Sequence, residues 1–173
     1  MTTTSTNFEE IRNSIRTIFA KGNEEIRKDA TPYGFEGLEL TPIIDFGTDG
    51  DGNHMTAKVT TNLLNLWNIT ESEVIEIGLN NITYNISDFF GMVIVSNNTM
   101  FKGASSVIPA TKELIKRYPN GYVVLPSSIH EVIIVPKDNE TNVEELNEMV
   151  RQINAGVVAE EDKLSDDIYE FVA

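Results

Sequence analysis

Tyr122-Val-Val-Leu-Pro-Ser-Ser-Ile-His-Glu-Val-Ile-Ile-Val-Pro136 is the stretch that decides the fold of this chain. Its two ends, residues 122–125 and 132–135, are short, rich in β-branched residues and apolar at every position. Runs of this kind are typical of central strands that are buried on both faces. The polar residues between them predict a tight loop, so the stretch indicates two neighbouring strands of one sheet.

Further strands are expected upstream of this stretch. Residues 40–46 and 55–60 flank a Gly- and Asp-rich turn, and apolar Met55, Ala57 and Val59 alternate with polar residues. This alternation predicts an antiparallel hairpin with one buried face and one wet face. Residues 92–96 form another apolar run and are expected to be a third strand.

Helices are predicted from apolar spacing and from capping signals. The first is expected to begin at a Thr6 cap and to run to about Lys21, because apolar residues recur at helical spacing. The clearest signal is the capping box of Thr70 and Glu73, which predicts a helix over 71–79 after a short helix over 62–67. Two more helices are expected, one capped by Ser106 and one opened by a capping box of Thr141 and Glu144 and ended by Gly156.

Together these elements indicate an α+β protein with a mainly antiparallel sheet of about five strands and helices packed on it. We expect a single domain over residues 1–173, in which residues 1–5 are disordered and residues 157–173 form an acidic C-terminal segment.

The charge is unevenly distributed. The chain has 173 residues and a formal net charge of −14, and residues 138–173 hold eleven acids against Arg151 and Lys163. Such a charge opposes direct binding of nucleic acid and of anionic lipid. No apolar run approaches a membrane span and the N-terminus is not a signal peptide, so a cytoplasmic location is expected. Because there is no cysteine, neither a thiolate nucleophile nor a thiolate metal site is possible.

The polar insert could hold a reactive centre. Ser127 or Ser128 could be a nucleophile, His130 its base and Glu131 the orienting acid, which is the constellation of a hydrolase. In an extended segment, however, neighbouring side chains such as His130 and Glu131 point to opposite faces. We therefore favour a structural interpretation, in which the serines bond their own backbone and His130 or Glu131 pins a neighbouring element.

Neither a metal nor a cofactor is expected. A metal site would require the two histidines, His54 and His130, to meet and to be joined by carboxylates. We expect His54 instead on the wet face of its strand. Asp49, Asp51 and Asn53 alternate as in a calcium loop, but the required glycine and the bidentate glutamate are missing, so a hairpin turn is favoured.

Four segments carry a resemblance to a known family. They are Trp67-Asn-Ile-Thr-Glu-Ser-Glu73, Gly103-Ala104, Leu125-Pro-Ser-Ser-Ile-His-Glu-Val132 and Leu164-Ser-Asp-Asp-Ile-Tyr169. Over about the last 105 residues the chain resembles an uncharacterised bacterial family, domain of unknown function 5688, and the LPSSxHE string is its most specific element. The resemblance implies a cytoplasmic bacterial protein, often carried on mobile elements or prophages, and brings no catalytic residues with it.

The expected function is therefore binding, not catalysis. We expect a non-catalytic acidic protein–protein interaction module of phage or mobile-element origin, whose acids engage a basic protein surface, for instance that of a host defence or nucleic-acid-binding protein. The candidate binding residues are Glu144, Glu145, Glu148, Glu160, Glu161, Asp162, Asp166 and Asp167. Two alternatives remain open: a hydrolase that uses Ser127 or Ser128 with His130, and a structural or regulatory protein without a charge-based partner.

Overall fold

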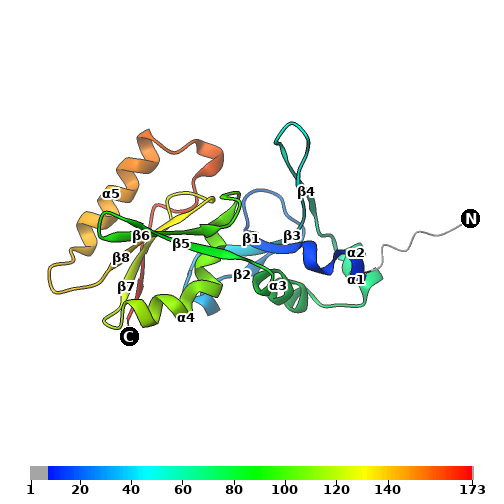
Figure 1. Ribbon diagram of the computed structural model, residues 1–173, viewed down its shortest axis with the longest axis horizontal. Helices are drawn as coiled ribbons and strands as arrows, with labels where there is room; N and C mark the ends of the chain where they lie inside the picture. Colours follow the sequence, from blue (N-terminus) through cyan, green and yellow to red (C-terminus); the bar gives the residue numbers. More distant parts are fainter. Residues whose placement is uncertain (1–7, 173) are drawn as a thin grey trace, which may run out of the picture.

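Two antiparallel sheets lie along an elongated molecule in the computed structural model, which describes residues 8–172 (Figure 1). The first sheet comprises β1 (Ile15–Phe19), β2 (Lys28–Asp29), β3 (Glu39–Thr48) and β4 (His54–Lys58). The second has the order β5-β6-β8-β7-β9 and comprises β5 (Tyr84–Phe89), β6 (Met92–Asn97), β7 (Tyr122–Leu125), β8 (Val132–Pro136) and β9 (Tyr169–Phe171). The α+β class is confirmed, although the strands form two sheets where one was expected.

The helical segments connect these strands and cover them. They are α1 (Phe8–Ile11), η1 (Arg12–Ser14), η2 (Thr31–Tyr33), α2 (Thr61–Trp67), α3 (Glu71–Asn80), η3 (Gly103–Ser106), α4 (Val107–Arg117), α5 (Val143–Gly156) and η4 (Glu160–Asp162). In the described part of the chain, every helix falls short of the length and apolarity that a bilayer crossing requires.

The neighbouring inner strands β7 and β8 of the five-stranded sheet are covered on both faces, β7 fully, whereas β8 is buried on one face and half-buried on the other. Tyr122 and Val124 of β7 pack in the core that α4 covers, whereas Val123 and Leu125 pack with Val150 of α5. Figure 1 shows α4 and α5 on opposite sides of this sheet. The acidic helix α5 therefore forms the outer layer of one sheet face.

The expected N-terminal helix is wrong beyond its first turn. Only α1 is α-helical, and residues 15–19 form β1, which pairs antiparallel with β3 from Ile15 opposite Ile44 to Phe19 opposite Leu40. The β-branched residues of this run favour a strand once a partner strand is available. The Thr6 cap and the disorder expected for residues 1–5 fall outside the described residues. The strands β5 and β9 were not expected from the sequence.

The capping predictions have different outcomes. Thr70 and Glu73 form the predicted capping box at the start of α3. The box expected at Thr141 is wrong, because Asn142 caps α5 by accepting hydrogen bonds from two backbone N–H groups. Ser106 precedes α4 as expected, but its side chain makes no capping bond.

One core cluster joins the two sheets. The Phe35 ring contacts Phe19 of the first sheet and both Tyr169 and Phe171 of β9, with ring centroids 5.1 to 5.5 Å apart. The acidic C-terminal segment thus packs into the interior through its aromatic residues.

Candidate functional site

The LPSSIHE string lies in the loop between β7 and β8, where the two sheets meet. Its backbone is bonded to two other segments. The N–H groups of Gly103 and Ala104 donate to the carbonyls of His130 and Ile129 at 3.1 and 3.0 Å. On the other side, the Ile129 N–H donates to the Asp162 carbonyl at 2.8 Å. The string therefore connects η3 with η4, and its backbone groups carry most of the connection.

The His130 ring is held through both nitrogens. The Lys102 backbone N–H donates to Nδ1 at 3.0 Å, so Nδ1 is an acceptor without a proton. The ring proton of the neutral imidazole is then on Nε2, which lies 3.0 Å from Oδ1 of Asp162 and donates to it. The side chain spans three segments, and it pins a neighbouring element as the structural interpretation expected.

The serines and the glutamate do not join His130 in a catalytic arrangement. Ser128 Oγ accepts a hydrogen bond from the His130 backbone N–H at 3.1 Å, a local turn interaction. In residues 8–172 no hydrogen bond links either Ser127 or Ser128 to the imidazole, and the Glu131 side chain forms neither a hydrogen bond nor an ion pair. A hydrolase would need a serine hydroxyl on a ring nitrogen, and both nitrogens have other partners here.

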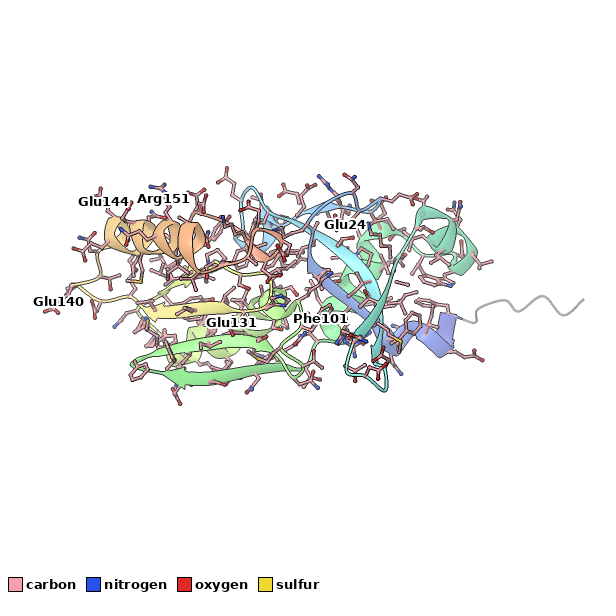
Figure 2. The ribbon with its side chains drawn as sticks, turned by 90° about the horizontal axis from the view of Figure 1, so that it is seen from above. Glu24, Phe101, Glu131, Glu140, Glu144 and Arg151 are labelled. Carbon is pink, nitrogen blue, oxygen red and sulfur yellow. The ribbon has the colours of Figure 1, made fainter. Side chains whose placement is uncertain are left out.

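Phe101 brings the second histidine close to the first. The His54 ring of β4 stacks on Phe101 with centroids 4.0 Å apart and an interplanar angle of 14°, and the centroid of His130 lies 6.0 Å from that of Phe101. Figure 2 places Phe101 between the two sheets, near the middle of the molecule. Sequence reasoning missed this role of Phe101, since an aromatic residue in a loop was the one available signal.

The placement expected for His54 is wrong, because its side chain is only 9% exposed and bonds Asp45 Oδ1 at 2.8 Å. Packing against Phe101 removes it from the wet face of the hairpin. Each histidine has a single carboxylate partner, and the described residues hold no group of three or more potential metal ligands of the His, Asp or Glu type.

Four of the eight candidate acids are held by His130, Asn154, Arg151 or Lys163. Asp162 bonds His130, Asp166 accepts from Asn154 at 2.7 Å, Asp167 lies 3.8 Å from Arg151, and Glu160 lies 2.6 Å from Lys163. The hydrogen bond from Lys163 lowers the pKa of the Glu160 carboxyl. Lys21 holds the same segment by donating to the backbone carbonyls of Glu160 and Glu161 at 3.2 and 3.0 Å.

The remaining four acids are exposed, and three of them share one helix. Glu144, Glu145 and Glu148 lie on α5, and the only partner of their carboxylates within residues 8–172 is Gln152, which donates to Glu148 at 3.1 Å. Figure 2 shows Glu144 on the outer side of α5, pointing away from the sheet. Glu161 is exposed on η4. The structure therefore divides the predicted set into four acids held by His130, Asn154, Arg151 or Lys163 and four exposed acids that form no ion pair within residues 8–172.

The fold and this site define an α+β protein with two antiparallel sheets, in which a polar loop of the second sheet is bonded to η3 and η4. The chain belongs to the Family of unknown function (DUF5688), whose model matches residues 80–172. The matched region contains β5 to β9, α4, α5 and the LPSSIHE loop, whereas the first sheet with His54 precedes it. No curated protein matches the chain, and no solved structure matches it either.

Proposed function

We propose that this protein is a non-catalytic protein–protein interaction module that presents the outer face of α5 to a basic surface of its partner. The observation that carries the proposal is the group of exposed carboxylates of Glu144, Glu145 and Glu148, whose single side-chain partner within residues 8–172 is the uncharged Gln152. They lie within one helix turn of each other and no cation of the described chain neutralises them. Repulsion among them is relieved when a cationic partner binds.

The engagement of both nitrogens of His130 supports binding over hydrolysis by a Ser–His pair. In the specific form of the proposal, the module acts in the bacterial cytoplasm, derives from a phage or mobile element, and occupies the basic surface of a host defence or nucleic-acid-binding protein. Its carboxylates would then stand where phosphates bind. Metal and cofactor play no part in this proposal.

The test uses a fluorescently labelled peptide rich in lysine and arginine, and measures its binding by fluorescence anisotropy over a series of salt concentrations. In the triple variant E144Q/E145Q/E148Q we expect the affinity at low salt to fall about tenfold and the salt dependence to become flatter, because fewer charges are engaged. A matched control, E10Q/D51N/E71Q, removes the same number of charges from exposed positions outside α5 and should retain most of the affinity.

Equal affinities of the two triple variants would contradict a binding face on α5. Affinity that does not change between low and high salt would favour a structural or regulatory protein without a charge-based partner.

A further inference from the structure

The hairpin between β5 and β6 ends in an unusual turn. Phe89 pairs with Met92, so Phe90 and Gly91 form a two-residue loop. Both have positive φ angles, 47° and 81°. Turns of this kind favour Asn-Gly, because a side chain in the left-handed region is strained unless it is small and polar. Phenylalanine at this position is thus unfavourable for the backbone.

Burial does not offset this strain. The Phe90 side chain is 91% exposed, and its ring contacts that of Phe89, itself 40% exposed, with centroids 4.9 Å apart. Two aromatic rings therefore project into solvent at the tip of the hairpin. A strained residue that contributes no core contact indicates selection for a function, such as contact with another molecule, and not for the stability of the fold.

A groove of about 300 Å³ connects this tip with α5. Its apolar lining includes Phe90, Met92, Leu146 and Met149, and Met149 is 47% exposed. Grooves of this size are at the lower end of those that hold ligands and can accept one or two large apolar side chains. Methionine lining suits such a groove because it adapts its shape to what binds.

The rim of the groove is acidic. Asp138, Glu140 and Glu145 line it, and Glu144 adjoins it on α5. The hydrogen bond from the Glu140 backbone N–H lowers the pKa of the Asp138 carboxyl, so that group stays charged. Within the described residues the carboxylates of Glu140 and Glu145 have no hydrogen bond or ion pair, and Figure 2 shows Glu140 at the far end of the molecule. The cation nearest in sequence, Lys137, is bound to Glu170 at 2.6 Å.

We propose that this groove is the docking site for a segment of a partner protein that inserts one large apolar side chain between Phe90 and Met149 and places lysine or arginine side chains on the acidic rim. The inference rests on the proposed function and names the partner's chemistry at the same face. Charge complementarity selects this occupant. A second copy of the chain would bring −14 against −14, and an anionic membrane would meet the same repulsion.

The probe is a pair of labelled peptides of equal charge, each with lysines on both sides of a central residue that is tryptophan in one and alanine in the other. We expect the tryptophan peptide to bind about tenfold more tightly, since a buried aromatic anchor contributes about this much. In the variant F90N, whose turn residue tolerates the left-handed conformation better, this preference should be lost while the weaker binding of the alanine peptide persists. The control L66N removes an exposed apolar side chain from α2 and should keep the preference.

An equal affinity of the two peptides for the unaltered protein, or a preference that survives F90N, would overturn the groove as the docking site. Both proposals can be separated in the same assay. If the unaltered protein shows no tryptophan preference but E144Q/E145Q/E148Q loses the binding of the alanine peptide, the acidic face is supported and the groove is not. If neither peptide binds the unaltered protein, both proposals are overturned. If the unaltered protein dimerises in sedimentation experiments and F90N does not, the groove binds a second copy of the chain and the proposal of a different partner protein is refuted.

Discussion

Replacing Gly103 by alanine tests how tightly η3 and the His130 loop pack on β6. A Cβ atom at this position would lie 2.3 Å from Ser96 Oγ and 2.6 Å from the backbone nitrogen of Asn97. Ordinary contacts are at about 3.5 Å, so the η3 backbone would have to retreat by roughly 1 Å. Because one of the opposing atoms belongs to the backbone of β6, the clash cannot be relieved by a side-chain rotation alone.

The cost follows from the bonds at this point. Retreat of η3 weakens the hydrogen bond from the Gly103 N–H to the His130 carbonyl, which is 3.1 Å long, and displaces the Ser96 hydroxyl that donates to the same carbonyl at 2.7 Å. Each bond contributes about 1 kcal/mol and overpacking costs about 1–3 kcal/mol. We therefore expect the free energy of unfolding to fall by about 3 kcal/mol, which corresponds to a decrease in Tm of roughly 10 °C for a chain of this size.

The assay is urea unfolding of the whole chain followed by far-UV circular dichroism, supported by thermal unfolding. Gly156→Ala is the matched control, because this glycine ends α5 and a Cβ atom there meets nothing within 4 Å. It should leave stability unchanged or raise it by a few tenths of a kcal/mol. A free energy of unfolding of G103A within about 0.5 kcal/mol of that of the unaltered protein would refute a tight contact between η3 and β6.

Three further outcomes are expected. His130→Ala leaves the Lys102 N–H without its acceptor and should lower the free energy of unfolding by about 1–2 kcal/mol in urea unfolding; an unchanged value would show that the ring does not brace the loop. Phe90→Asn should raise it by about 1 kcal/mol, because asparagine tolerates the left-handed turn, and a decrease would refute the strain. The hydrogen bond from the Thr70 backbone N–H lowers the pKa of the Glu73 carboxyl in the folded protein. The ionised carboxylate therefore stabilises the fold at pH values above its unfolded pKa of about 4.3. This contribution is lost as the pH falls through the lower, folded pKa. Glu73→Gln should therefore be the less stable protein at neutral pH and converge with the unaltered one in acid, as thermal unfolding across a pH series would reveal.

The elements whose structure depends on neighbouring residues alone were predicted correctly from the sequence. The strands β7 and β8 and the capping box of α3 were predicted because every residue of each signal lies within a few positions. The run of residues 15–19 fits both helical spacing and a β-branched strand, and its pairing with β3 decides between them. A bracing role was predicted for either His130 or Glu131, and His130 is the residue that forms the bonds. Its partners Lys102 and Asp162 were not predicted, because they lie 28 and 32 residues away and only the tertiary fold brings them together.

The acidic surface was predicted only in outline, since composition counts carboxylates but does not show which of them have partners. Five of the eight acids, Glu148 among them, accept hydrogen bonds or form ion pairs within the protein itself. The exposed Phe90 was missed because nothing in its sequence context distinguishes a hairpin turn from a core residue.

The bonds from Lys21 to the carbonyls around Glu160 join residues that are 139 positions apart. Contacts of such separation form late, because most of the chain must already be ordered before the two ends meet. Refolding from urea should accordingly be slow, and it is complete only when β9 pairs with β7. Until then the aromatic side chains of Phe35 and Phe171 stay uncovered, which makes this interval the period in which the protein is most prone to aggregation.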